Sequence, residues 1–377
     1  IYLDGNSLGA LPRAVLTRMD EVLRREWGEG LIGSWNTADW MSLNRTVGAK
    51  IAPLVGAGHD DVHIGDSTTV TLFKTMVAAA RMRPDRTAIV VEKGTFPTDG
   101  YVAAGVARTL GLEVRWCDPA DPLAALDDKV ALLSLTHVDF RTGAMFDAPA
   151  ITRAAHEVGA LIQWDLCHSV GAVPVDLTGI DADFAVGCTY KYLNGGPGSP
   201  AFAWVAPRHQ PGLDQPITGW MGHADPFAMT RDYAPAAGIG RLASGTPPVL
   251  ALSSLDAALS VFEGVSMTDV RSVSLSLTRL FMELVDDRLG EVELVTPRSE
   301  ARGSQVSLRH PEAYGVVQAL IARGVVGDFR TPDIARFGLA PMYLRHVDVY
   351  DAVEQLALVL EGREYADPAY SRRHAVT

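Results

Sequence analysis

The sequence predicts an α/β fold with a large, mostly parallel sheet and a smaller C-terminal α/β domain. Short apolar runs, such as 161–164 and 201–205, each stop at polar or glycine-rich turns, as the buried strands of a parallel sheet do. Longer stretches with helical spacing, such as 13–27, alternate with these runs. We expect a large domain over 31–255, and a small domain formed by 1–30 and 256–377, where helical and strand patterns alternate again.

The composition narrows the classes of protein to which the chain can belong. It has 377 residues, 47% of them hydrophobic, and a formal net charge of −12 from 33 basic and 45 acidic residues. This balance is typical of a globular protein with a large core, and the lack of a basic stripe argues against nucleic acid as a partner. No apolar run approaches the ~18 residues of a membrane helix, and no signal peptide is visible, so we expect no membrane partner.

The cysteines and histidines argue against a disulfide framework and against a metal site. Cys117, Cys167 and Cys188 form no CxxC pair, which fits the reduced cytoplasm. None of the ten histidines has a convincing metal-ligand spacing, so we expect no metal. The chain begins at Ile1, inside a motif and without methionine, and we expect a segment to precede it.

Helical spacing and β-rich runs place the individual elements. We expect helices over 13–27, 41–55, 65–80, 150–158 and 249–262, with a further helix from residue 100, and strands over 87–91, 110–116, 130–135, 161–164, 183–189 and 201–205. Gly56 and Gly159 follow two of these helices, where glycine commonly ends a helix.

Two segments have the composition of a phosphate site. The segment 28–33 matches G-x-G-x-x-G, but it follows a helical pattern rather than a strand, and no acidic residue stands about 20 positions on, so we reject a dinucleotide site. The segment 65–69 reads GDSTT and begins a helix. Its hydroxyl groups can cap that helix, which is their commoner role, while the same free N–H groups can bind phosphate.

The stretch 161–200 carries the clearest chemistry. One strand stops at Asp165, with His168 three residues later, and another strand run stops at Tyr190-Lys191. Because α/β sheets bind ligands at the carboxyl ends of their strands, we expect these side chains at one rim. They suit pyridoxal 5′-phosphate: the lysine holds the aldehyde as a Schiff base, and the acid pairs with the protonated pyridine nitrogen. An ordinary ion pair between Asp165 and Lys191 is the alternative.

Motifs along nearly the whole chain resemble those of the kynureninases, which are fold type I (aspartate aminotransferase-like) pyridoxal-phosphate enzymes. They are LDGNSLG (3–9), SWNTADW (34–40), FPTD (96–99), WDLCHS (164–169), TYKYLNGGPG (189–198), GWMGH (219–223) and RLASGTPP (241–248). The resemblance implies that the large domain binds the cofactor and that a homodimer shares its active sites. It also implies hydrolysis of L-kynurenine to anthranilate and L-alanine, a step of tryptophan catabolism in the kynurenine pathway, which links to NAD biosynthesis.

The same resemblance implies roles for individual residues at the cofactor. Lys191, Tyr190 and Asp165 would be catalytic, and His168 would orient Asp165 or the cofactor; a core histidine is the ordinary alternative. The other implied cofactor contacts are Thr68, Thr69, Phe96, Pro97, Thr98, Asp99 and Thr136, together with Trp220 and Thr246 from the neighbouring subunit.

Three residues are implied to contact the substrate. Trp35, expected on an exposed loop, would stack on the aromatic ring, with Gly245 forming a small side of the pocket. Arg336 would bind the α-carboxylate bidentately. A core tryptophan and a surface charge pair are the ordinary alternatives. We expect L-kynurenine to be preferred over 3-hydroxykynurenine, because an indole offers little to a ring hydroxyl.

Three other functions fit parts of the sequence. The first is a kynureninase that prefers 3-hydroxykynurenine. The second is another fold type I lyase such as a cysteine desulfurase, which needs a mobile loop cysteine, whereas the three cysteines here fall at or beside strands. The third is a regulator that binds pyridoxal phosphate without turnover, which the intact set of Lys191, Asp165 and Arg336 disfavours.

Overall fold

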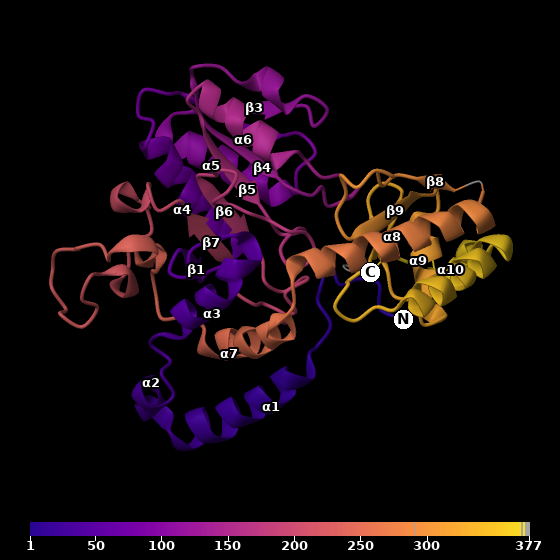
Figure 1. Cartoon of the computed structure of the whole chain (residues 1–377), viewed down its shortest axis with the longest axis horizontal. Helices are drawn as coiled ribbons and strands as arrows, with labels where there is room; N and C mark the ends of the chain where they lie inside the picture. The colour runs from indigo at the N-terminus through magenta and orange to yellow at the C-terminus, as the bar shows by residue number, and fades with distance from the viewer. Residues whose placement is uncertain (291, 371, 374–377) are drawn as a thin grey trace.

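A computed structural model describes residues 1–290, 292–370 and 372–373, and shows two sheets with helices packed around each (Figure 1). The larger sheet has seven strands in the order β1-β7-β6-β5-β4-β2-β3. Its strands are β1 (Val62–Ile64), β2 (Ala88–Glu92), β3 (Glu113–Cys117), β4 (Val130–Thr136), β5 (Leu161–Asp165), β6 (Phe184–Gly187) and β7 (Phe202–Val205). The pairs from β3 through β6 are parallel, and only β7 and β1 run antiparallel to their neighbours, so the prediction of a mostly parallel sheet is confirmed.

Helices cover both faces of the seven-stranded sheet. They are α3 (Leu43–Ile51), α4 (Thr68–Arg81), α5 (Pro97–Leu110), α6 (Ala148–Glu157) and α7 (Val249–Ala258). One buried cluster joins α4 and α5 to the sheet through Ile89 and Val91, while Ala88 and Val90 face the cluster under α3, α6 and α7. Because successive strand residues point to opposite faces, a short and mostly apolar strand such as β2 serves both cores.

The second sheet lies beside the first and has four antiparallel strands in the order β10-β11-β9-β8. Its elements are α8 (Met267–Arg288), β8 (Glu293–Leu294), β9 (Gln305–Arg309), α9 (Ala313–Ala322), β10 (Asp328–Arg330), β11 (Ile334–Gly338) and α10 (His346–Glu361). The N-terminal segment joins this sheet, since Tyr2 bridges to Val326 and Asp4 bridges to Gly338. Leu3 between them is fully buried in the core of the second sheet.

Several element boundaries differ from those expected. The helix expected over 13–27 is α1 (Arg13–Glu21) continued by a π-helix (Val22–Glu29), and those over 41–55 and 249–262 both end in 3₁₀ turns. The strand expected from residue 110 begins only at 113, because Leu110 ends α5 and Gly111 follows in the left-handed region at φ +71°. The loop expected around Trp35 is a short helix, α2 (Ser34–Thr37).

Two further features concern membranes and metals. Among the described residues, no single helix is both long and apolar enough to cross a bilayer; only Val249–Phe262 and Met267–Arg288 together meet those criteria, and they are bent by 82°. No group of three or more potential metal ligands gathers anywhere in the described part of the chain.

A buried carboxylate fixes the edge of the sheet where β5, β6 and β7 begin or end. Asp183, just before β6, accepts a hydrogen bond from the backbone N–H of Ile162 at 2.9 Å. It also binds His156 of α6 at 2.8 Å, and Arg208 and His209 after β7 at 2.7 and 2.6 Å. Burial would raise the pKa of Asp183, but these hydrogen bonds lower it to about 2.

We expect Asp183→Asn to lower the free energy of unfolding at pH 7 by about 2 kcal/mol, because a pKa lowered from 3.8 to about 2 is worth that much stabilisation of the charged form. The contribution is present above the unfolded-state pKa and is lost as the pH falls toward 2. Urea unfolding at pH 7 and pH 3 measures this contribution. The difference in the free energy of unfolding between wild type and Asp183→Asn should be smaller at pH 3 than at pH 7. Asp181→Asn is the control, since Asp181 contacts Arg208 and His156 from an exposed position. Equal losses in the two variants would contradict the assignment.

Candidate functional site

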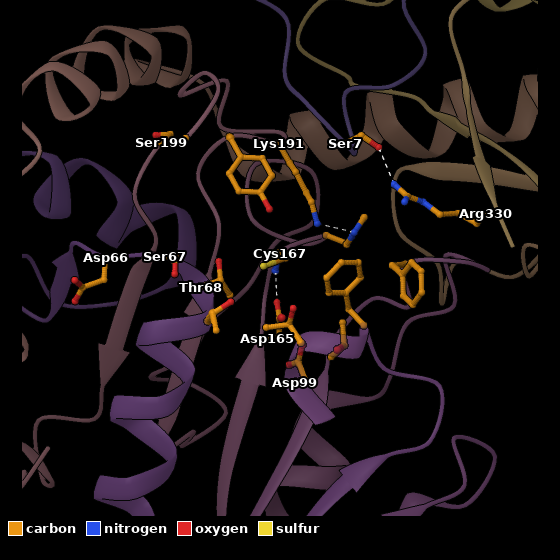
Figure 2. Close-up of a pocket in the computed structure, with 18 of the residues that line it drawn as sticks. Ser7, Asp66, Ser67, Thr68, Asp99, Asp165, Cys167, Lys191, Ser199 and Arg330 are labelled. Atoms are coloured by element: carbon orange, nitrogen blue, oxygen red, sulfur yellow. Dashed lines mark hydrogen bonds between the residues drawn. The ribbon is translucent and has the colours of Figure 1, made fainter. Parts of the chain in front are cut away.

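A cavity of about 340 Å³ opens at the carboxyl ends of β4, β5 and β6, and we call it the first cavity. Thr136 and Asp165 are the last residues of β4 and β5, and Tyr190 and Lys191 follow β6. Figure 2 shows Lys191 entering this space from one side and Asp165 from the other. The cavity is lined by Ser7, Asp66, Ser67, Thr68, Thr69, Phe96, Thr98, Asp99, Thr136, Phe140, Asp165, Cys167, His168, Tyr190, Lys191, Gly198, Ser199, Arg330 and Arg336.

Two carboxyl groups lie together at the floor of the first cavity (Figure 2). Asp165 is buried and accepts a hydrogen bond from the backbone N–H of Cys167 at 2.6 Å. Asp99, in the first turn of α5, is buried beside it, and burial together with the negative charge of Asp165 raises the pKa of Asp99 well above its usual range. The protonated form of Asp99 is thus favoured over what an exposed aspartate would show.

The Lys191 amine is held by a histidine rather than by an acid. Its Nζ lies 2.8 Å from Nε2 of His168. Burial and the positive charges of Lys191, Arg336 and Arg330 lower the pKa of His168 well below its usual value, so the ring is neutral and accepts this hydrogen bond. Within the described residues Lys191 forms no salt bridge with Asp165, so the alternative of an ordinary ion pair between them does not hold.

The N-terminus of α4 forms another wall of the first cavity. Ser67 caps the helix, since its Oγ accepts a hydrogen bond from the N–H of Val70 at 3.4 Å. Thr68 and Thr69 follow it in the first turn, where backbone N–H groups have no acceptor within the helix, and both line the cavity. Such a helix start is suited to an anion, so capping and anion binding are compatible here.

A cluster of two arginines, one aspartate and one serine joins the second sheet to the first cavity. Arg336, on β11, is buried and donates from Nε to Asp328 at 2.8 Å, from Nη1 to the carbonyl of Phe140 at 2.6 Å, and from Nη2 to Asp328 and Ser7 at 2.5 and 2.8 Å. Burial would raise the pKa of Asp328, but the two arginines lower it. With Arg330 bound to the same carboxylate, the cluster keeps one net positive charge.

The arginines of that cluster keep N–H groups that the cluster itself does not use. A guanidinium has five N–H groups, and the four bonds above leave one of them, on Nη1 of Arg336. Arg330 bonds to Ser7 and Asp328 through Nη2, and it lines the first cavity as well. Both arginines can therefore reach a carboxylate.

Aromatic and hydroxyl groups complete the wall formed by β4 and the start of α5. Phe96 and Phe140 meet edge to face with ring centroids 5.3 Å apart. The hydroxyl groups of Thr95 and Thr136 are 2.8 Å apart beneath them. This contact fixes the segment before α5, so Phe96 presents its partly exposed ring to the cavity.

Five of the residues singled out in the sequence lie outside the first cavity of their own chain. Trp35 is half-buried on α2 and packs edge to face on Trp40, with centroids 5.7 Å apart. Trp220 begins a 3₁₀ turn and packs on Phe227, while Gly245 and Thr246 are exposed. Pro97 starts α5 and borders a neighbouring hollow.

Eight lining residues were not singled out in the sequence: Ser7, Asp66, Ser67, Phe140, Cys167, Gly198, Ser199 and Arg330. Six of them adjoin or fall within segments already of interest: Ser7, Asp66, Ser67, Cys167, Gly198 and Ser199. Arg330 and Phe140 had no such signal, because they reach the cavity only through the packing of the second sheet against the turn after β4.

Comparison with known proteins places the chain among pyridoxal-phosphate enzymes. Residues 270–356 match the family model of the kynureninase C-terminal domain. A kynureninase from Burkholderia mallei is 51% identical over 387 residues, covering 100% of this chain and 93% of that protein.

Two solved structures share the fold at low sequence identity. A mutant of C-DES with glycine covalently linked to its PLP cofactor has a TM-score of 0.83 at 15% identity, covering 94% of this chain and 96% of that one. The cysteine desulfurase CsdA from Escherichia coli has a TM-score of 0.80 at 20% identity, covering 96% and 94%. At such low identity, these two likenesses establish the fold alone.

We expect Gly9→Ala to destabilise the protein and disturb the first cavity. Gly9 donates to the carbonyl of Tyr190 at 2.7 Å, and a methyl group on it would overlap the carbonyl of Lys191 and approach Cα of Asn194 to 2.7 Å. Forcing a methyl into such a site costs about 1–3 kcal/mol. Thermal unfolding and KM measure the effect. Gly105→Ala is the control: it has open space inside α5 and should be neutral or stabilising. The idea fails if both variants behave like wild type.

Proposed function

Because this chain belongs to the kynureninase family, we propose that its first cavity is where L-kynurenine is hydrolysed to anthranilate and L-alanine with the aid of pyridoxal phosphate. The chain is thus a hydrolase that acts on a small molecule. The proposal rests on one observation above all: the amine of Lys191 and the carboxyl groups of Asp165 and Asp99 enter a single cavity from different sides.

The residues of the first cavity fit each part of the cofactor. The start of α4 with Thr68 and Thr69 offers donors to a phosphate, and the Lys191 amine can bond to the aldehyde. The carboxyl groups of Asp165 and Asp99 suit a protonated ring nitrogen. Phe96 offers a ring for stacking. When bound, pyridoxal phosphate supplies the aldehyde and an electron-accepting ring.

Each protein group then has a defined task in the reaction. Lys191 Nζ, displaced by the substrate amine, moves the proton at the substrate Cα, and His168 directs it through the 2.8 Å hydrogen bond. Asp165 keeps the ring nitrogen protonated, and Asp99 lies beside it with a raised pKa. Tyr190 holds the phosphate and lends a proton. Water adds to the γ-carbonyl of the substrate, and the Cβ–Cγ bond then breaks. The γ-carbon leaves with the water oxygen as the carboxyl group of anthranilate, and Cβ takes up a proton to give L-alanine.

The substrate carboxylate is assigned to the arginine cluster. Arg336 contributes its remaining Nη1 N–H, and Arg330 contributes the donors that Asp328 and Ser7 leave free. The bidentate contact expected of Arg336 alone is therefore shared between two side chains.

The alternative of a cysteine desulfurase lacks its sulfur acceptor. Cys117, Cys167 and Cys188 are all buried, whereas that chemistry needs a cysteine on a mobile loop. For the substrate ring, we retain the preference for L-kynurenine over 3-hydroxykynurenine, because the indole of Trp35 has no acceptor for a ring hydroxyl.

We also propose a cytoplasmic homodimer whose subunits complete each other's sites. Large apolar side chains are exposed on the loop that carries Trp220, where Phe227 is 62% and Met229 73% exposed, and beside α2, where Ile32 is 81% exposed. A second copy covering these surfaces would bring Trp35, Trp220 and Thr246 to its partner's cavity. Three unpaired, buried cysteines are compatible with a reducing compartment.

Replacing Lys191 by Ala tests the central assignment. We expect the visible absorbance of the bound cofactor to change and turnover of L-kynurenine to fall by at least ~10³-fold, since both the covalent anchor and the base are lost. Asp165→Asn should keep the visible absorbance of the bound cofactor, and its turnover should fall less than that of Lys191→Ala. A Lys191→Ala protein with wild-type turnover would refute the proposed site.

Replacing Arg336 tests the carboxylate contact. We expect Arg336→Gln, which leaves Asp328 paired with Arg330, to raise KM for L-kynurenine about tenfold to a hundredfold. KM for the decarboxylated amine should rise far less. Arg345→Gln, a change at an exposed arginine, is the control. Equal losses for both compounds would move the carboxylate site elsewhere.

Mixed dimers test the shared sites. Lys191→Ala and Trp220→Ala chains should each be impaired alone. When the two are co-expressed, one site of each mixed dimer combines an intact Lys191 with an intact Trp220 from the other chain. We expect isolated mixed dimers to recover about half of the wild-type turnover, because one of two sites is restored. No recovery, or an active monomer by light scattering, would exclude shared sites.

A further inference from the structure

A second cavity of about 530 Å³ lies between the two sheets and shares no lining residue with the first. On the side of the large sheet it is bordered by Glu92, the last residue of β2, and by the turn 139–146. On the side of the small sheet it is bordered by Val295, Arg309 and the segment 332–334. None of the motifs that identify the first cavity includes these residues.

Glu92 is a buried acid with unused hydrogen-bonding capacity that lines the second cavity. Its side chain is 2% exposed, and Oε2 has no hydrogen-bond partner among the described residues. Burial and the nearby charge of Asp139 raise the pKa of Glu92 to about 7. Burying a carboxyl oxygen without a hydrogen bond lowers the free energy of unfolding, and an N–H or ammonium donor bound in the cavity would supply the missing hydrogen bond.

Arg141 supplies the complementary charge. Its Nη2 donates to the carbonyl of Gly94 at 3.2 Å, and its guanidinium packs over the ring of Phe140 with 5.2 Å between Cζ and the ring centroid. Within the described residues it forms no salt bridge with Glu92, although both line the cavity. The guanidinium therefore keeps donors for an anionic group.

The other charged side chains of the second cavity already have partners within the protein. Oδ1 of Asp139 accepts from the backbone N–H groups of Arg141 and Thr142 and from the Thr142 hydroxyl. Arg309 is paired with Glu293 and Asp333. Much of the remaining lining is apolar, and it consists of Pro119, Ala120, Ala144, Met145, Phe146, Val295, Pro332 and Ile334.

We propose that the second cavity binds an α-amino acid with an apolar or aromatic side chain, its ammonium group at Glu92, its carboxylate at Arg141 and its side chain among Met145, Phe146 and Val295. The ammonium group meets a carboxylate oxygen that has no partner among the described residues, and the carboxylate meets a guanidinium whose one side-chain hydrogen bond goes to the carbonyl of Gly94. The cavity is also large enough for an aromatic amino acid.

Such a ligand would influence the first cavity through two short links. Gly94, which accepts from Arg141, stands two residues before Phe96, a wall of the first cavity. Phe140, next to Arg141, lines the first cavity and accepts from Arg336. Because the ligand would also touch both sheets, its binding would restrain how they sit against each other.

The test is calorimetric titration of the holoenzyme with L-phenylalanine, with the cofactor absorbance recorded in parallel. Binding at Lys191 alters the cofactor absorbance and does not depend on Glu92. Binding in the second cavity leaves the absorbance unchanged and depends on Glu92. We expect Glu92→Gln and Arg141→Gln each to weaken the absorbance-silent binding at least about tenfold, the worth of one charge-assisted contact. Val295→Trp, which fills the cavity, should abolish it even if Glu92→Gln does not fold. Glu263→Gln, at an exposed acid, should leave it unchanged.

Two half-ligands separate the contacts. Phenethylamine should bind more weakly than L-phenylalanine and be sensitive to Glu92→Gln only, and 3-phenylpropanoate should be sensitive to Arg141→Gln only. The proposal is overturned if no absorbance-silent binding occurs in the millimolar range, or if Val295→Trp leaves that binding intact.

Discussion

The close approach of two buried carboxyl groups, Asp165 and Asp99, is the constraint around which the first cavity is built. Burial and the neighbouring Asp165 raise the pKa of Asp99 well above its usual range, because two carboxylates side by side disfavour each other's charged form. This pair of acids makes the floor of the site suitable for a cationic ring nitrogen. Burial, followed by the positive charges of Lys191, Arg336 and Arg330, lowers the pKa of His168 and keeps its ring neutral. A neutral imidazole can accept from the lysine, and this sets the direction of the Lys191 amine.

The N-terminal segment is what couples that charge arrangement to the small sheet. It adds bridges at Tyr2 and Asp4 to the edge and end of the four-stranded sheet, and Gly9 then lies against the backbone of Tyr190 and Lys191. Ser7, between these anchors, hydrogen-bonds to both arginines and to Asp328. The proposed carboxylate site therefore depends on three separate parts of the chain. A shift of the small sheet would alter the arginines and the segment beside Lys191 together.

The second cavity shows the other consequence of building a site between two sheets. In the turn after β4, Phe140 lines the first cavity and the next residue, Arg141, lines the second. Glu92 ends β2 one strand away from Thr136, yet it is directed to the second cavity rather than to the first. Strand ends in an α/β sheet thus offer polar groups to more than one cavity when a second domain closes over part of the rim.

The sequence by itself determined the fold class, the strand ends at Asp165 and Lys191, and the helix start at Thr68 and Thr69, because these features depend on local apolar runs and on turn residues that interrupt them. Element boundaries such as the end of α5 at Leu110 were less certain, since a glycine in the left-handed region ends a helix without interrupting the apolar pattern. Only the tertiary structure decided that Lys191 is held by His168 rather than by Asp165, and that burial beside Asp165 raises the pKa of Asp99. It also decided that Arg330, Ser7 and Phe140 join Arg336. These facts depend on distances between segments up to 329 residues apart in the chain, and on burial, which no local pattern encodes. The position of Trp35 on a short helix away from its own cavity was likewise decided by packing on Trp40.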